Sequence, residues 1–313
     1  MGKVIVRRLA VSVPILLVVA TLSFALVHLL PGDPGRVVLG NSATAEQVRA
    51  VNQQLGYDRP LATQYTSWLG DALQGDLGTS IINGRAVSED LSSRIPVTLS
   101  LAIGATLLSA VLGIALGMVS AIRGGWADRT GQGLAALGLA IPNFWLAVLL
   151  VLVFAIKLKW LPAVGYVSYE DSVGQWARYL ILPVLAVGVS GITGIARQTR
   201  GAMIDVLSRD YIRTLAAAGV PRRSILFKHA LRNASIPVIS NIGFTFISML
   251  GGAVIIEQLF NLPGIGQWTL AVVDKHDLPE IQGVVVYSTA IVLVVNLLAD
   301  VGAAWLNPKV RRR

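Results

Sequence analysis

The sequence has no cysteine and is poor in charge: Asp, Glu, Lys and Arg make up 14% of its 313 residues, against about 25% in an average soluble domain. Without cysteine there are no disulfides, no thiol catalysis and no thiolate ligands for zinc or iron–sulfur clusters. Apolar residues make up 54% of the chain, and the mean hydropathy is +0.67. A soluble core of this size cannot enclose so much apolar surface, so we expect lipid to be part of the solvent.

Short motifs of common catalytic sites are also missing. No G-x-x-x-x-G-K-[ST] phosphate-binding loop, no H-E-x-x-H and no G-x-S-x-G occurs in the sequence. The three histidines, His28, His229 and His276, are expected to lie far apart and on both faces of a membrane, which makes them poor metal ligands. We therefore expect no enzyme, no metal and no cofactor bound by this chain.

What the sequence does contain is long apolar runs. A helix needs about 20 apolar residues to cross a bilayer core of about 30 Å. Six stretches have this length and character: 9–30, 97–122, 132–156, 179–196, 234–256 and 281–303. Asp300, in the last stretch, is the one Asp, Glu, Lys or Arg among them. The stretches predict an all-α, polytopic membrane protein with six transmembrane helices. The fourth is short and rich in glycine. The first could be a signal peptide, but its 22 residues exceed the roughly 7–15 of such a segment, so we favour a retained span.

Charge is distributed unequally between the two sides of these spans. Segments on the side of the N-terminus (1–8, 123–131, 197–233 and 304–313) hold 17 Lys and Arg against 3 Asp and Glu. The opposite segments (31–96, 157–178 and 257–280) hold 9 against 13. The positive-inside rule then places both termini in the cytoplasm. The net charge of +9 follows from topology, which argues against nucleic-acid binding.

The expected domains follow the loops: an N-terminal tail and first transmembrane helix (1–30), an extracytoplasmic loop subdomain (31–96), and a five-helix core (97–313). We expect helices near 45–55 and 64–73 in the outer subdomain. The cytoplasmic segment 197–233 is predicted to form a helix, a tight turn at Gly219 and Pro221, and a second helix that leads into the fifth span. Its alanines and glycine leave a surface with little side-chain bulk, suited to a protein partner or to the inner leaflet.

The same segment resembles the cytoplasmic loop of permease subunits in binding-protein-dependent ABC importers. Arg213-Thr214-Leu215 stands at its start, Gly219 is its glycine, and Leu231-Arg232 stands in the last position; the family's acidic first residue and its proline are absent. These departures resemble the dipeptide/oligopeptide branch, and further stretches agree with it in order: 28–34, 74–80, 141–145, 251–257 and 307–311. The chain is most similar to the first of the two permeases in such systems, which implies the type I importer permease fold.

The resemblance implies a set of partners. They are a second homologous permease, cytoplasmic ATPase subunits that carry ATP and Mg, and an extracytoplasmic substrate-binding (lipo)protein in a bacterial cytoplasmic membrane. Cargo would be peptide-like, although members of the branch also import nickel complexes, glutathione, opines or haem-like molecules. The residues implied in ATPase coupling are Tyr211, Arg213, Thr214, Ala217, Gly219, Pro221, Arg222 and His229.

Polar residues inside the spans are candidates for the translocation path. Asn241, Thr245 and Ser248 follow one stripe of the fifth stretch, and Asn143 follows Pro142 in the third. Such residues also join helices to each other, and both interpretations stay open. Glu257 is either an external gate or binding-protein contact, or an acid in a turn at the water interface. Gly113 and Gly117 indicate helix packing, and Asp300 a structural pair.

Three other functions are weighed on the same residues. An ion-coupled secondary carrier would have several ionisable groups within its spans, whereas Asp300 stands alone. A channel needs a ring of carbonyls or charges, and no such filter sequence is visible. A membrane enzyme needs a nucleophile and a base, and neither is arranged in a motif.

Overall fold

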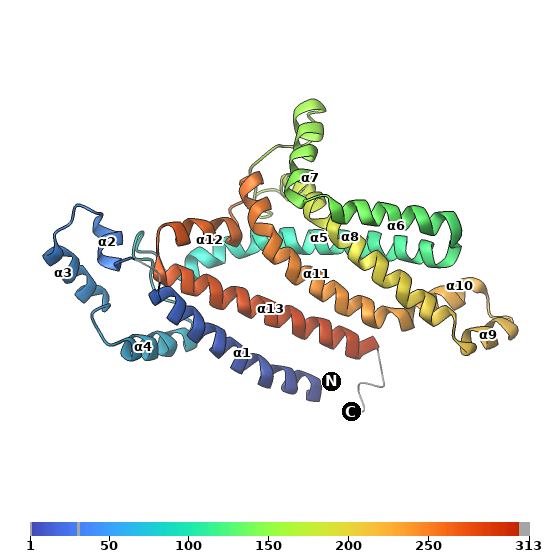
Figure 1. Ribbon diagram of the computed structural model, residues 1–313, viewed down its shortest axis with the longest axis horizontal. Coiled ribbons are helices and arrows are strands. Elements are labelled where there is room, and N and C mark those ends of the chain that lie inside the picture. Colours follow the sequence, from blue (N-terminus) through green and yellow to red (C-terminus); the bar gives the residue numbers. More distant parts are fainter. Residues whose placement is uncertain (1, 30–31, 307–313) are drawn as a thin grey trace. The chain divides into compact units, whose positions relative to one another are not determined.

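The computed structural model describes residues 2–29 and 32–306 and shows a helical protein (Figure 1). Leu30, which ends the first stretch, and Pro31, which like Leu30 belongs to motif 28–34, lie outside the described residues, as does the C-terminal motif 307–311. Within the described part, β-structure is limited to one isolated bridge between Thr79 and Ala86. The all-α prediction is confirmed. The chain forms two compact units, residues 1–5, 99–262 and 294–313 in the first and 6–98 and 263–293 in the second.

Five helices of the described chain are long and apolar enough to cross a membrane, or six if one bent pair forms a single span. They agree with the predicted stretches and extend beyond most of them. The spanning helices are α1 (Gly2–Leu29), α5 (Val87–Arg123), α8 (Val173–Leu207), α10, η2 and α11 as one run (Arg222–Phe260), and α13 (Leu278–Leu306).

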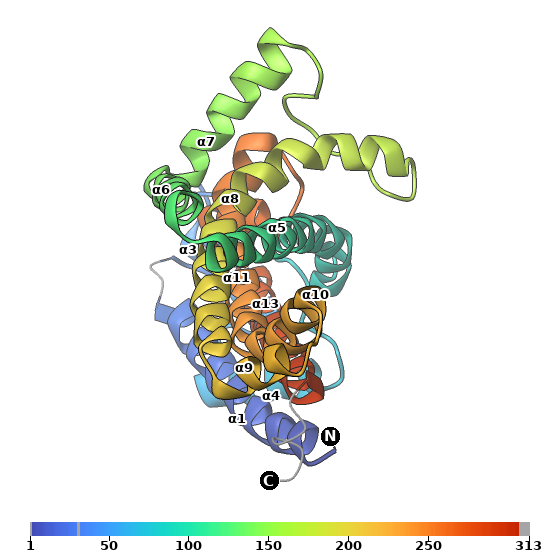
Figure 2. The same cartoon turned by 90° about the vertical axis from the view of Figure 1, so that its right-hand side faces the viewer.

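The third predicted stretch is not one straight helix. α6 (Gly125–Ala140) is followed by a break at Ile141 and Pro142. α7 (Asn143–Leu150) and the π-helical η1 (Val151–Lys157) then run together at 94° to α6. Pro142 explains the break, because it has no N–H to donate and it forces the preceding residue out of the helical region. Ile141 is accordingly extended, with φ −85° and ψ 120°. Figure 2 shows α6 nearly end-on while α7 lies across the view.

The fourth stretch, short and rich in glycine in the sequence, is confirmed as a span and is the middle part of the 35-residue helix α8. Glycine is tolerated in α8 because neighbouring helices fill the space that side chains leave. A Cβ on Gly188 would lie 3.0 Å from Leu108 of α5, and one on Gly191 would lie 2.9 Å from Thr245 of α11. Tertiary packing thus overrides the low helix propensity of glycine.

The contact between α5 and α8 depends on small residues. A Cβ on Gly113 would come within 2.8 Å of the Ile195 side chain, and one on Gly117 within 2.5 Å of the Ala196 carbonyl oxygen. Only glycine allows the two backbones this close. The prediction that Gly113 and Gly117 serve helix packing is confirmed.

The second unit contains α2 (Pro34–Leu39), α3 (Ala45–Leu55), α4 (Leu61–Leu73) and α12 (Ile265–Asp274), together with most of α1, the start of α5 and the first half of α13. Both predicted loop helices are confirmed, and the second begins three residues earlier than expected. Thr44 and Gln47 form a capping box at the start of α3. The buried core of this unit consists of Val27, Val87, Leu91, Ile265, Trp268, Val272, Ile281 and Val284.

Candidate functional site

The segment predicted to be cytoplasmic and to couple to a partner contains α9 (Asp210–Ala217), a turn and α10 (Arg222–Ser224). The π-helical η2 (Ile225–Ala230) follows and continues into α11 (Leu231–Phe260). The predicted helix–turn–helix is confirmed. One side of α9 is anchored in a cluster with Met203 and Val206 of α8: Ile212 is buried in it, and Tyr211 and Leu215 pack against it. The opposite side of α9 is left uncovered.

Gly219 closes α9 by a two-bond cap. Its φ is +76°, its N–H donates to the Ala216 carbonyl at 3.1 Å, and the Val220 N–H donates to the Leu215 carbonyl at 3.1 Å. This is the Schellman arrangement, which satisfies carbonyls that the helix end would otherwise leave unpaired. Nothing lies within 4 Å of the place where a Cβ of Gly219 would stand, so the turn is open to solvent.

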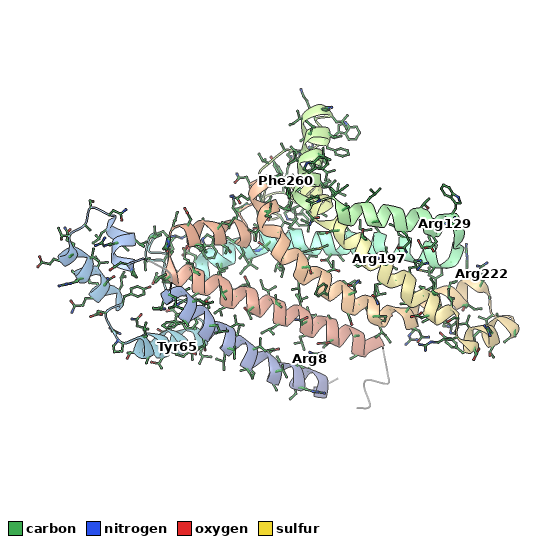
Figure 3. The ribbon with its side chains drawn as sticks, viewed as in Figure 1. Arg8, Tyr65, Arg129, Arg197, Arg222 and Phe260 are labelled. Atoms are coloured by element: carbon green, nitrogen blue, oxygen red, sulfur yellow. The ribbon has the colours of Figure 1, made fainter. Side chains whose placement is uncertain are left out.

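The structure brings the candidate coupling residues together. Six of them are exposed on α9, the turn and α10, namely Arg213, Thr214, Ala217, Gly219, Pro221 and Arg222, while Tyr211 and His229 are half-buried beneath them. We call these six exposed residues the coupling surface. All three of Arg129, Arg197 and Arg222 belong to the first unit, and Figure 3 shows them toward the same end of it, as the charge count predicts for a cytoplasmic side.

Two polar contacts near this surface were not foreseen from the sequence. The Asn233 side-chain amide donates to the Tyr211 hydroxyl and to the His229 carbonyl, both at 3.0 Å, and so ties α9 to the start of α11. Arg200 of α8 holds the Asp128 carboxylate of α6 by two bonds of 2.5 Å each. A sequence signal for the second pair existed, because Asp128 is one of only three acids among the 17 basic residues on its side.

The three polar residues on one stripe of α11, Asn241, Thr245 and Ser248, have different surroundings in the structure. The Asn241 amide donates to the Gly194 carbonyl of α8 at 3.2 Å, and Thr245 is buried where α11 meets Gly191. Ser248 is exposed instead. Asn143 is half-buried at the first position of α7, beside the bend. The structure therefore gives Asn241 and Thr245 contacts within the helix bundle and leaves Ser248 uncovered.

Glu257 does not lie at a water interface, and that expectation is wrong. Its exposed fraction is 0%, and its carbonyl accepts the Leu262 N–H at 2.8 Å where Asn261 ends α11 in the left-handed region. Helix α11 continues to Phe260, which itself is buried, so Glu257 lies inside the unit and not at its edge.

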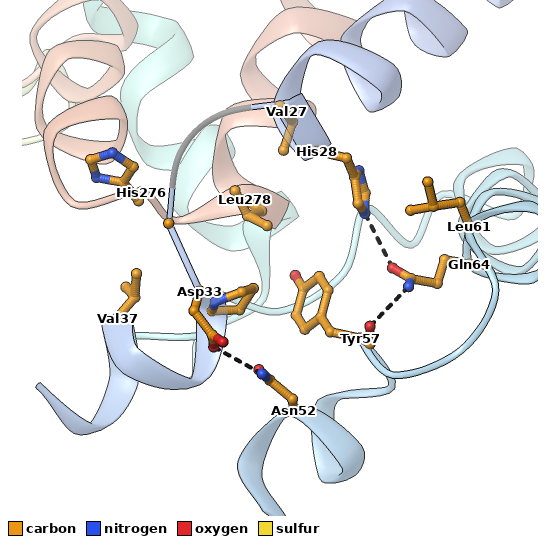
Figure 4. Close-up of a pocket in the computed structure, with 12 residues that line it drawn as sticks. Val27, His28, Asp33, Val37, Asn52, Tyr57, Leu61, Gln64, His276 and Leu278 are labelled. Atoms are coloured by element: carbon orange, nitrogen blue, oxygen red, sulfur yellow. Dashed lines mark hydrogen bonds between the residues drawn. The ribbon is translucent and has the colours of Figure 1, made fainter. Parts of the chain in front are cut away.

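The second unit contains a cavity of about 260 Å³ that is lined by both polar and apolar residues (Figure 4). His28 and His276, expected to be far apart, both line it, because residues 263–293 pack back on the outer end of α1. His28 Nε2 lies 3.1 Å from Gln64 Oε1, and the Asn52 amide donates to Asp33 at 2.8 Å. Burial, followed by the nearby Asp277 charge, raises the pKa of Tyr57 to about 12.

Next to this cavity, a buried polar contact joins two loops of the same unit. The Ser80 hydroxyl donates to the Asp277 carboxylate at 2.5 Å, and both residues are buried. The Asn83 amide reaches the carboxylates of Asp90 at 3.3 Å and Glu280 at 3.4 Å. In the described residues, no group of three or more His, Asp or Glu is placed to hold a metal ion.

Comparison with known proteins agrees with this architecture. The fold is similar to that of the inward-facing MetNI methionine ABC transporter, with a TM-score of 0.54 at 16% identity over 69% of this chain and 96% of that one. A putative peptide transport system permease protein of Brucella abortus (strain 2308) is 39% identical, over 99% of both chains. The glutathione transport system permease protein GsiC of Salmonella typhi is 42% identical, over 98% of both.

Two family descriptions match almost the whole sequence. Residues 1–102 match the N-terminal part of a binding-protein-dependent transport system membrane component, and residues 113–312 match the inner membrane component itself. Together with full-length relatives well above 30% identity, these matches assign the family. The chain belongs to the binding-protein-dependent transport system inner membrane components, the permease subunits of ABC importers.

Proposed function

We propose that this permease forms half of a translocation pathway for peptides or related small solutes, paired with a second homologous permease. Solute is delivered by an extracytoplasmic binding protein, and ATP is hydrolysed on separate cytoplasmic subunits. The names of the relatives, peptide and glutathione permeases, support a cargo with peptide bonds. The ion-coupled carrier considered from the sequence finds no support in this family membership.

The observation that carries the proposal is the coupling surface. α9 is short, anchored on one side by Ile212 and uncovered on the other, where Thr214 and Ala217 offer little bulk. A helix held in this way transmits force, because its buried side cannot shift without moving α8 and α11. A partner groove can approach its exposed side closely, and the arginines around it favour an acidic rim on that partner.

Within the pathway we assign different roles to the polar residues. Ser248 and Asn143 are proposed to contact solute, Ser248 because it is uncovered in this chain and Asn143 because it stands at the bend after Pro142. Asn241 and Thr245 are proposed to act by holding α11 on α8 at the edge of the path. Glu257 is proposed as a gate residue that acts from inside the bundle, since it offers no exposed surface.

Both termini are proposed to lie in the cytoplasm, on the side of α9. Because the chain has no cysteine, single cysteines report orientation directly. Arg222→Cys should react with a membrane-impermeant maleimide only after cells are opened, and Lys159→Cys should react in intact cells. The reverse pattern would overturn the orientation.

The transport proposal is tested by purification and reconstitution. The chain is isolated from membranes in mild detergent, the proteins that co-elute are identified by mass spectrometry, and the complex is placed in liposomes. We expect an ATPase and a second permease to co-elute, and labelled dipeptide to accumulate only with ATP and the loaded binding protein. Accumulation without nucleotide, or by this chain alone, would refute the proposal.

A further inference from the structure

α4 differs in chemistry from its neighbour in the same loop. α3 carries Glu46, Arg49 and several amides, as a helix in water does. α4 has a single charged residue, Asp71, and none of its described residues is fully covered by the rest of the chain. Leu61 and Leu73 keep 57% and 75% of their surface exposed. An apolar helix that the rest of the chain leaves uncovered is expected to lie in an environment less polar than water.

Side-chain contacts fix the level of α4 along α1. The Tyr65 hydroxyl lies 2.6 Å from the Thr21 hydroxyl, and Gln64 Oε1 lies 3.1 Å from His28 Nε2. The Phe24 ring lies 5.3 Å from that of Tyr65 and 5.9 Å from that of Trp68. α4 therefore runs beside the last two turns of α1, both within the second unit.

The level of Thr21 and Tyr65 along α1 lies inside the boundary of a bilayer. α1 has an apolar span at Ile5–Leu29, and Thr21 is eight residues before Leu29, which is about 12 Å along a helix axis. A span of 25 residues is about 37 Å long and exceeds a hydrocarbon core of about 30 Å by only a few Å at each end. Tyr65 thus reaches past the headgroup level, where amphipathic helices lie about 5–10 Å deep.

The faces of α4 match such a position. Gln64, Tyr65 and Trp68 face α1, and the adjoining side carries Ala62, Leu69 and Leu73. Thr63, Ser67 and Asp71 lie on the remaining side and are exposed. Tyr and Trp are enriched where a membrane meets water, because their rings are apolar and their tips are polar.

We propose that α4 is an interfacial helix whose partner is the outer leaflet, with Leu69 and Leu73 among the acyl chains and Ser67 toward water. Because no Lys or Arg lies in α4, its attachment relies on apolar and aromatic contact and is independent of anionic lipid. α4 and α1 together then form a lipid-anchored arm that holds the outer subdomain close to the membrane. The proposal requires α1 to span the membrane and is independent of the transported solute.

Spin labels on single cysteines test the position of α4. Leu73→Cys, Ser67→Cys and, as a control on α3, Gln54→Cys are labelled in the complex purified from membranes, after the cysteines of the other subunits have been replaced. The complexes are placed in liposomes of neutral lipid and of lipid with anionic headgroups. Collision rates with oxygen, which partitions into lipid, and with a water-soluble nickel chelate are measured by power saturation.

We expect the label at 73 to collide several-fold more with oxygen than with the chelate in both lipids, and the labels at 67 and 54 to show the reverse. A label at 73 as open to the chelate as that at 54 would overturn the proposal. So would a label at 73 shielded from both reagents, which would identify a protein subunit as the occupant. Circular dichroism of each variant checks that the helices are retained.

Discussion

Arg200 holds Asp128 by two bonds at once, Nε to one carboxylate oxygen and Nη2 to the other, and so joins α8 to the first turn of α6. A planar guanidinium matches a carboxylate in this way, and lysine cannot reproduce the geometry. The pair lies on the side where basic residues prevail, and it fixes the start of the bent third span against α8.

Breaking this pair should loosen α6. We expect Asp128→Asn and Arg200→Lys to lower the midpoint of thermal unfolding in detergent to a similar degree, since each removes the same two-point contact. The double variant should then add little to either single one. Asp205→Asn is the control, because it removes one negative charge from an exposed site on α8. If all three single variants unfold alike, the pair does not stabilise the fold.

Gly117 should not tolerate even one methyl group. A Cβ there would stand 2.5 Å from the Ala196 carbonyl oxygen, and backbone cannot move aside as a flexible side chain does. We expect Gly117→Ala to cost about 1–3 kcal/mol of stability. Gly201→Ala, where nothing lies within 4 Å, should instead gain about 0.5–1 kcal/mol from the better helix former. Denaturation of the two variants side by side measures the difference, and equal behaviour would contradict close α5–α8 packing.

A bulky side chain on the coupling surface should lower transport. Ala217 is exposed, so Ala217→Trp leaves the fold of this chain intact while filling the space that a docking groove needs. We expect uptake in liposomes to fall at least about tenfold, the effect of roughly 1.4 kcal/mol of lost docking free energy. Ala217→Ser is the control and should keep uptake. Normal uptake by the tryptophan variant would show that no partner contacts α9.

Gly219 should be sensitive to backbone conformation and not to space. Alanine at φ +76° costs about 1–2 kcal/mol, whereas asparagine adopts this region more easily. We expect Gly219→Asn to retain more stability and more ATPase stimulation than Gly219→Ala. The order of the two variants is the measurement, and an unchanged protein with alanine would mean that the turn rearranges freely.

Removing the Ser80 hydroxyl should destabilise the outer unit. Ser80→Ala leaves the buried Asp277 carboxylate without its 2.5 Å donor, which we expect to cost about 1–3 kcal/mol. Proteolysis of the outer loop in intact membranes should accelerate accordingly. Ser92→Ala, which removes an exposed hydroxyl bonded to the Glu89 carbonyl, should change little. Equal rates of proteolysis for the two variants would show that the Ser80 hydroxyl does not stabilise this unit.

Tyr57 makes the outer unit sensitive to alkali. Its folded pKa of about 12 exceeds the ordinary 10.0, so the unfolded chain loses this proton first as pH rises. The stability that Tyr57 contributes is therefore complete below pH 10 and is lost as pH rises toward 12. Absorbance at 295 nm should show late tyrosine titration, and Tyr57→Phe should reduce its amplitude. Burial also raises the pKa of Tyr166, so that residue remains in the late step. An amplitude that is unchanged in the variant would assign the late step to other tyrosines.

The sequence predicts the helices well because their causes are local. A run such as 97–122 needs no knowledge of its neighbours to require lipid, and Thr44 or Gly219 marks a helix end by its own chemistry. The bend at Pro142 also had a local cause, but its angle depends on where α7 packs. The residues that gather on α9 and the turn after it were implied by the resemblance to importer permeases, whereas the distribution of charge predicted only the side of the membrane.

Contacts between distant segments could not be predicted in this way. Nothing near Glu257 in the sequence indicates that it is buried, because burial depends on which helices surround the end of α11. The spacing of Asn241, Thr245 and Ser248 correctly gives one stripe on a helix, but it cannot tell which part of that stripe α8 covers. His28 and His276 meet at one cavity for the same reason, since 247 residues of chain separate them.

The helical run from Arg222 to Phe260 continues through η2 and α11 for 39 residues, or about 58 Å. Pro221 and the coupling surface stand at one end of it, and at the other the Phe260 carbonyl accepts the Gly165 N–H at 2.8 Å. A straight rod of this length that tilts by 10° about its middle shifts each tip by about 5 Å in opposite directions. Two features interrupt the regular hydrogen bonding of this run, the π-helical turns of η2 and Pro237 in α11, so the run has two places at which it can bend between Arg222 and Gly165 and absorb part of such a tilt.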